Sequence, residues 1–88
     1  MNTSLEKEII YKLFRRKIIG GVHKSKEDIL RWFRKDVKGA AKRALERLVR
    51  SSLVVKKPAS YGRRYTLNRD KLREIESLIE EYLEENRA

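Results

Sequence analysis

The hydrophobic period of the chain changes at Ser51-Ser52, and this change limits the folds that are open to it. Before the serines, residues 36–50 separate apolar from charged side chains at helical spacing. The apolar side holds Val37, Ala41, Ala44, Leu45 and Leu48. After the serines the period falls towards two, with Leu53 and Val55 on one arm and Tyr65 and Leu67 on the other. The pattern predicts a helix followed directly by a β-hairpin, in a mostly α domain of the α+β class.

The first segment of the chain has the periodicity and the capping residues of a helix. Residues 3–17 are amphipathic, and Thr3 with Glu6 matches a capping box at their start. Gly20-Gly21 interrupts the pattern. We therefore expect an extended connection at Val22-His23, which can pair as a very short strand.

Three later helices begin at residues that can cap them. Ser25 with Asp28 indicates a short helix of about eight or nine residues, whose buried face is expected to contain Ile29, Leu30 and Phe33. Asp36 is placed to cap the first turn of the third helix with its carboxylate. Asn68 is a good N-cap for the last helix.

The predicted order is helix, short extended piece, helix, helix, hairpin and helix. In this order the chain resembles the winged helix-turn-helix superfamily over nearly all of its 88 residues. The most specific part of the resemblance is KGAAKRALERLVRSSLVVKKPASYGRRYTLN, which reads as a recognition-type helix, a small break and two strands joined by a basic wing. Members of this family usually have a glycine at the break, where this chain has Ser51-Ser52.

The resemblance implies a role for each part of the chain. Residues 1–68 would form the DNA-binding core, in which the helix at 36–50 enters the major groove. The wing at 56–64 would touch the DNA backbone or the minor groove. Residues 69–88 would form a C-terminal helix of the same domain, since a chain of 88 residues is long enough for one hydrophobic core only.

Charge is unevenly distributed along the chain, which carries a net charge of +10. Residues 1–68 hold 19 basic and 6 acidic groups, a net charge of +13, whereas residues 69–88 hold 4 basic and 7 acidic groups, a net charge of −3. We therefore expect a polyanion to meet the first part of the chain. Abundant Lys, Arg and Glu without Cys is also typical of heat-adapted proteins.

The charged side of the third helix is the first candidate for nucleic-acid contact. Gly39 lies within it, although Gly in a helix interior costs about 1 kcal/mol relative to Ala. A close approach by another backbone would explain that cost. Arg43 and Lys42 are expected to pair with guanine. The predicted contact set is Lys38, Gly39, Lys42, Arg43, Glu46 and Arg50. The alternative is a solvated face with ordinary surface ion pairs.

The loop between the two arms, KKPASYGRR, is the second candidate. Arg side chains on a projecting loop can enter a narrow minor groove, and Tyr61 can stack on a base. Lys on an edge strand could instead only prevent aggregation. The predicted wing contacts are Lys56, Lys57, Tyr61, Arg63 and Arg64, and further possible phosphate contacts are Lys24, Ser25, Lys26 and Lys35.

The last helix carries a wider apolar stripe than one neighbouring helix requires. Because surplus apolar surface usually finds a partner, we expect homodimerisation through Leu72, Ile75, Leu78, Ile79, Tyr82 and Leu83. A dimer would prefer a palindrome with half-sites about one helical turn apart. The alternative is a long core helix in a monomer.

Several other classes of function lack support in the sequence. The chain has no Cys and one His, His23, so no metal site is expected. No nucleophile, base and orienting group can be assembled, so we expect no enzymatic activity and no cofactor. Apolar runs end at three residues and no signal peptide is visible, so we expect a cytoplasmic protein.

The sequence therefore predicts a double-stranded DNA-binding protein, most simply a small transcriptional regulator. Two alternatives stay open. One is an RNA- or ribosome-associated winged-helix protein, which would be equally basic. The other is a protein-interaction module whose charged face meets an acidic protein.

Overall fold

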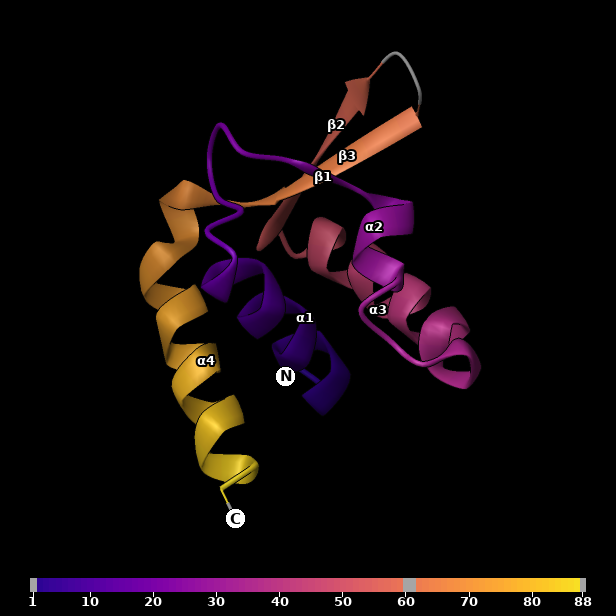
Figure 1. Cartoon of the computed structure of the whole chain (residues 1–88). Coiled ribbons are helices and arrows are strands. Elements are labelled where there is room, and N and C mark those ends of the chain that lie inside the picture. The colour runs from indigo at the N-terminus through magenta and orange to yellow at the C-terminus, as the bar shows by residue number, and fades with distance from the viewer. Residues whose placement is uncertain (1, 60–61, 88) are drawn as a thin grey trace.

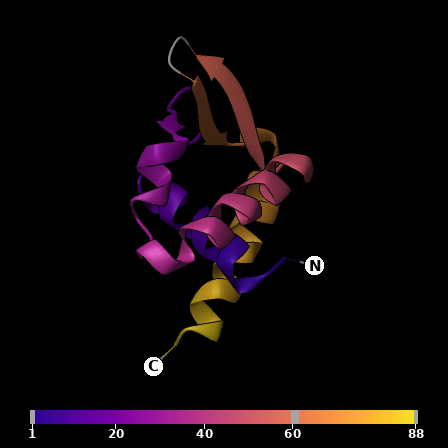
Figure 2. The same ribbon diagram turned by 90° about the vertical axis from the view of Figure 1, so that its right-hand side faces the viewer.

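The computed structural model describes residues 2–59 and 62–87, which form four α-helices, a three-stranded antiparallel sheet and two 3₁₀ turns (Figure 1). The α-helices are α1 (Ser4–Arg15), α2 (Lys26–Leu30), α3 (Lys38–Arg50) and α4 (Leu72–Glu85). The strands are β1 (Lys24–Ser25), β2 (Val54–Ala59) and β3 (Gly62–Leu67), and the turns are η1 (Lys35–Val37) and η2 (Arg69–Lys71). The mostly helical α+β class and the predicted order of elements are confirmed. The β2–β3 hairpin projects beyond the helices (Figure 2).

Three of the predicted caps are present. The hydroxyls of Thr3 and Ser25 each accept a hydrogen bond from the amide three residues on, at 3.1 Å, at the starts of α1 and α2. Asn68 Oδ1 accepts from the amide of Asp70 at 3.0 Å, at the start of η2, which leads into α4.

The predicted start of α3 and the predicted length of α2 are wrong. Residues 35–37 form η1, so Asp36 lies inside a turn and its carboxylate pairs with Arg34 at 3.1 Å instead of capping α3. Helix α2 has only five residues. It ends early because the amides of Trp32 and Phe33 bond to carbonyls three residues back, at 3.1 Å each, which tightens the chain into a turn.

Helices α1 and α3 end in the same way. The residue after the C-cap, Lys17 or Ser52, takes a left-handed conformation with φ of 59° or 67°. The next residue, Ile18 or Leu53, donates its amide back to the last helical turn at 3.0 or 3.1 Å. Both of these residues are buried, so each reversal returns an apolar side chain to the core. The break at Ser51-Ser52 is thus the position where a glycine is favoured.

The short first strand lies two residues later than predicted. The chain at Ile18–Gly20 already pairs with Leu67 at the end of β3, through amide–carbonyl bonds of 3.1 and 3.3 Å. Val22 and His23 therefore belong to the connection that leaves this point, and only Lys24–Ser25 returns to pair with β3. The sheet order is β1-β3-β2.

The hairpin differs from the prediction in its register and in its length. Val54, paired with Leu67, is buried, whereas Val55 is only half-buried, because the turn at Ser52 makes Leu53 a core residue ahead of the strand. The strands continue to Ala59 and Gly62, so most of the predicted loop at 56–64 is paired strand. The predicted contact residue Tyr61 lies outside the described residues.

One core joins all the helices to the sheet. Fully buried side chains come from each, including Leu13 of α1, Ile29 of α2, Leu45 of α3, Leu67 of β3 and Ile75 of α4. Helix α4 is therefore part of the same core as the rest of the chain. Every helix within residues 2–59 and 62–87 is too short or too polar to cross a membrane.

Candidate nucleic-acid interface

Helix α3 divides sharply into a buried and a charged face. Ala41, Ala44, Leu45 and Leu48 are fully buried, as the sequence predicts. Gly39, Lys42, Arg43 and Arg50 are exposed on the other side. A depression of about 490 Å³ on this side is lined by Gly39, Lys42, Arg43, Glu46, Arg47 and Arg50.

The cations at the centre of this face have no carboxylate partner among the described residues. None of Lys38, Lys42, Arg43 and Arg50 forms an ion pair within residues 2–59 and 62–87. The alternative of a solvated face expects Arg43 and Arg47 to pair with Glu46, but in the described residues Arg47 pairs with Glu6 and Glu46 pairs with Lys56. We call these four side chains together with Gly39 the α3 face.

Glu46 differs from the four cations of the α3 face because its carboxylate is bonded to other residues of the protein. Its carboxylate accepts hydrogen bonds from Lys56 Nζ and from Tyr65 Oη, both at 3.2 Å, and so joins α3 to both long strands. Burial raises the pKa of Glu46, but the bonds from Lys56 and Tyr65 and the charges of Lys56 and Lys26 outweigh it and lower the pKa below its usual value. Glu46 therefore stays ionised and fixes the angle between α3 and the hairpin.

Tyr65 is the neutral partner in this link. Burial raises the pKa of Tyr65 to about 12, with further contributions from the charge of Glu46 and from their hydrogen bond. The phenol thus remains a hydrogen-bond donor across the physiological range.

Arg47, in the last turn of α3, anchors this helix to α1. Its guanidinium bonds to the carboxylate of Glu6, which is only 5% exposed and also accepts a 2.9 Å bond from Asn2 Nδ2. Burial raises the pKa of Glu6, but the bonds from Arg47 and Asn2 and the charge of Arg47 lower the net pKa below its usual value. This pair was not predicted from the sequence, because 41 positions separate the two residues and no local pattern connects them.

The basic residues of the hairpin lie on two opposite faces of the sheet. Lys56 is paired with Tyr65, which faces α3, whereas the next pair, Lys57 with Arg64, must face the other way. Arg63 shares the α3 side with Lys56 by the same alternation. The predicted wing residues therefore do not form one surface: Lys56 and Arg63 continue the α3 face, and Lys57 and Arg64 lie on the outer face.

The other predicted phosphate contacts surround α3. Lys24 pairs in register with Tyr65, and Lys26 lies near enough to Glu46 to lower its pKa. Lys35 is exposed in η1, directly before α3. The Ser25 hydroxyl is already the cap of α2, which leaves its proton for any further bond.

The predicted dimerisation stripe is only partly available. Ile75, Leu78 and Ile79 are at most 8% exposed, because they pack into the core of the same chain. Leu72 and Tyr82 are half-buried, and Leu83 is 49% exposed. The remaining surface is a groove of about 620 Å³ between α1 and α4, lined by Tyr11, Phe14, Arg15, Lys17, Ile19, Leu72, Ile79 and Leu83. The contribution of α1 to this groove was not predicted, because residues 3–17 show only the amphipathic pattern of a helix that packs on a core.

No group of three His, Cys, Asp or Glu side chains in the described part of the chain could hold a metal ion. Comparisons with protein-family models, with curated protein sequences and with solved structures found no match.

Proposed function

We propose that this protein is a winged helix-turn-helix protein that binds double-stranded DNA and acts as a small transcriptional regulator. The observation that carries the proposal is the α3 face: four cations and a glycine without carboxylate partners among the described residues, on a helix whose other side is fully buried. Buried packing fixes such a helix rigidly, and unpaired cations on it favour a polyanionic partner.

A duplex with an open major groove is the polyanion that fits a rigid helix best. The major groove of B-DNA, about 12 Å wide, admits an α-helix, whereas the deep and narrow major groove of A-form RNA does not. Arg43 and Lys42 lie in the middle of the exposed side and would read guanine O6 and N7. Arg63, on the same side of the hairpin, would hold a neighbouring phosphate, whereas Lys56 is paired with Glu46 at 3.2 Å.

Selection from random duplexes, with structured RNA as competitor at two salt concentrations, tests this function. We expect enrichment of a duplex sequence and an affinity that falls steeply with salt. Preferential binding of RNA at both salt concentrations would replace the proposal by RNA association. Weak binding of both at moderate salt would instead favour a protein partner.

Charge-reversal variants on two different helices test which surface binds the duplex. Lys42→Glu and Arg43→Glu on α3 are expected to weaken duplex binding more than Arg73→Glu, an exposed position on α4. All three variants change the net charge equally, so a difference between them reports position. Equal losses would remove α3 from its proposed role.

We also propose that the groove between α1 and α4 joins two copies of the chain. Arg15 and Lys17 line its α1 side, and by helical spacing Glu76 and Glu80 border its α4 side next to Leu83. A two-fold axis along the groove places the basic side of each copy over the acidic side of the other. The complementary charges favour this arrangement, and the dimer would present two α3 helices to a palindrome.

A further inference from the structure

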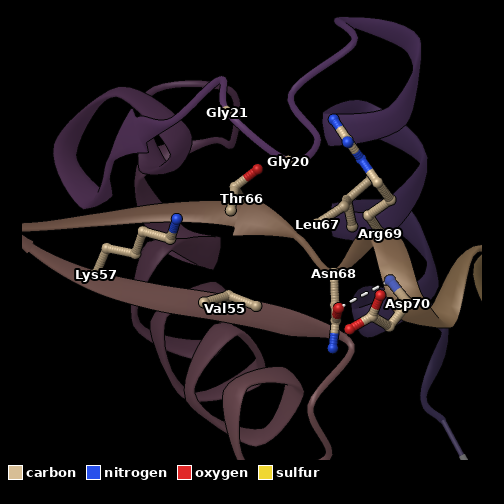
Figure 3. Close-up of a pocket in the computed structure, with 9 residues that line it drawn as sticks. All are labelled: Gly20, Gly21, Val55, Lys57, Thr66, Leu67, Asn68, Arg69 and Asp70. Atoms are coloured by element: carbon tan, nitrogen blue, oxygen red, sulfur yellow. Dashed lines mark hydrogen bonds between the residues drawn. The ribbon is translucent and has the colours of Figure 1, made fainter.

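A separate pocket lies on the outer face of the sheet, away from α3 (Figure 3). It has a volume of about 410 Å³ and lies where the connection after α1 crosses the end of β3. Its lining residues are Gly20, Gly21, Val55, Lys57, Thr66, Leu67, Asn68, Arg69 and Asp70. Nothing in the interface described above uses this pocket.

The floor of the pocket contains a polar group without a partner. Thr66 is 1% exposed, and its Oγ1 atom and His23 Nε2 are the two buried side-chain polar atoms of the described residues that lack a hydrogen bond. Figure 3 shows the Thr66 oxygen pointing from β3 towards the Gly20–Gly21 segment. A valine of the same shape would avoid the desolvation of the hydroxyl, so this hydroxyl calls for an explanation.

Two cations reach the same pocket. A Cβ atom at Gly20 would clash with Arg69 Nη2, so the guanidinium can take this position only because Gly20 has no side chain. Lys57 comes from the neighbouring strand. Neither cation forms an ion pair within residues 2–59 and 62–87. The carboxylate of Asp70 lies at the opposite end of the pocket from Lys57, beside Asn68 (Figure 3).

We propose that this pocket binds a phosphate group. Arg69 and Lys57 supply the charge. The Thr66 hydroxyl donates a hydrogen bond once the Gly20 amide releases its 3.3 Å bond to the Leu67 carbonyl and the Gly20–Gly21 segment moves aside. Guanidinium, ammonium and hydroxyl donors together match the several acceptor oxygens of a phosphate. A Cβ at Gly21 would meet nothing within 4 Å, so no neighbouring group packs against the segment in that direction.

Titration of the isotope-labelled full chain with inorganic phosphate tests the site, with chloride at matched ionic strength as the control. We expect saturable shifts of the Gly21 and Thr66 amide resonances with phosphate and not with chloride. Absence of saturable shifts at these amides, or shifts confined to the α3 face, would overturn the proposal.

Thr66→Val separates a ligand-binding hydroxyl from a structural one. Without phosphate the variant is expected to raise the melting temperature by about 4 °C or more, because it removes an unsatisfied buried group. Its phosphate affinity is expected to fall about tenfold. A lower melting temperature, or an unchanged phosphate affinity, would contradict the assignment of this hydroxyl to a ligand.

Arg69→Gln tests the charge and keeps the fold at an exposed position. It is expected to weaken phosphate binding about tenfold, whereas Lys71→Gln, a cation of the same turn that does not line the pocket, should change it little. Equal effects of the two variants would show that only net charge matters and would overturn the site.

The source of the phosphate is decided by a second ligand, a short single-stranded oligonucleotide without terminal phosphates. If the oligonucleotide saturates the pocket, the natural ligand is the nucleic-acid backbone. If only inorganic phosphate saturates it, the natural ligand is a free phosphate or a phosphomonoester. The Lys42→Glu variant should bind phosphate unchanged, since Lys42 lies on α3, outside the pocket. Loss of duplex binding in that variant would therefore leave the result for the pocket intact.

Discussion

Gly39 is exposed on α3, and nothing in the described protein requires a glycine there. A Cβ atom at this position would meet only Arg43 Nη1, at 3.8 Å. Gly39 is the second residue of α3, so Gly39→Ala is expected to raise the free energy of unfolding by less than the cost of about 1 kcal/mol in a helix interior, measured by urea denaturation. The same variant is expected to bind duplex more weakly, because the methyl group would stand between the helix and the nucleic-acid backbone. Unchanged duplex affinity would remove Gly39 from the interface.

Ser52 occupies the left-handed position in the turn between α3 and β2, where a glycine is usual. Its φ of 67° is costly for a residue with a Cβ atom, so Ser52→Gly is expected to stabilise the fold by about 1 kcal/mol. Ser51→Gly is the matched control. Ser51 has φ of −86° and its hydroxyl bonds to the carbonyl of Leu48 at 3.1 Å, so this change should lower stability. Thermal unfolding of both variants measures the difference, and the same sign for both would contradict the explanation.

Glu6 makes stability depend on acidity. Its pKa in the folded protein lies below the usual value of 4.5, so its contribution is present above that value and is lost as the pH falls through the folded pKa. Glu6→Gln is expected to be less stable than the natural chain at neutral pH, with a difference that shrinks on acidification. Urea denaturation at pH values between about 7 and 3 measures this.

A surface carboxylate provides the control for this titration. Glu84 pairs with Arg87 at 3.0 Å, but both side chains are about 70% exposed, and such pairs contribute little. Glu84→Gln should therefore lower the free energy of unfolding at neutral pH by less than Glu6→Gln does. A pH dependence that persists in Glu6→Gln would assign it to other groups.

The sequence predicts the local hydrogen bonds of single residues better than the distant ones. Thr3, Ser25 and Asn68 act as caps because their bonds reach only two or three residues along the chain. The pair of Glu6 with Arg47 depends on how α1 crosses α3, and no local pattern encodes that crossing. Asp36 does not cap α3 because residues 35–37 form η1, which places Asp36 inside a turn, one residue before the N-cap at Val37.

At the scale of elements, the periodicity of the sequence predicts that the hairpin exists but does not predict its register. The alternation of apolar and polar side chains predicts two strands. Their register depends on the left-handed turn at Ser52, which buries Leu53 in the core one residue before β2 begins. The same register decides which basic residues share a face. From the sequence alone, KKPASYGRR reads as one basic loop. In the structure it consists largely of two paired strands with cations on opposite faces.

Arg63 and Arg64 allow a direct test of the two faces. They are adjacent, exposed and chemically identical, but Arg63 lies on the side of α3 and Arg64 on the outer side. Arg63→Gln is expected to weaken duplex binding severalfold and to lower the slope of log affinity against log salt by about one. Arg64→Gln should have a smaller effect on both quantities. Equal effects would mean that the hairpin inserts edge-on and uses both faces.

At the scale of the whole molecule, the charges and the apolar surface are separated in space. The α3 face and its side of the hairpin are cationic, and α4, which carries most of the acidic residues of the last third, packs against α1 through Tyr11 and Tyr82, with ring centroids 5.3 Å apart. Lys7 draws two of these acidic residues, Glu81 and Glu85, onto α1 at 3.1 and 2.8 Å. The groove beside Leu83 lies outside these contacts, and the proposed second copy would bind there.

Leu83→Glu tests the dimer, and Val22→Glu is its matched control. The two side chains are 49% and 52% exposed, so a glutamate at either position should leave the fold intact. Only Leu83 lines the groove, and sedimentation equilibrium is expected to show a dimer for the natural chain and for Val22→Glu and a monomer for Leu83→Glu. A natural chain that sediments as a monomer would refute the dimer.

In the proposed dimer, the charges beside the groove would decide how the two copies are oriented. Arg15→Glu alone is expected to weaken the dimer by placing an acidic residue opposite Glu80, and the double change with Glu80→Arg is expected to restore it, because the reversed pair is again complementary across the two-fold axis. Failure of the second change to rescue the first would exclude this orientation. In Leu83→Glu the binding of an isolated half-site should persist while the added affinity for the palindrome is lost, since each α3 face is complete within one copy and only the linkage between the two disappears.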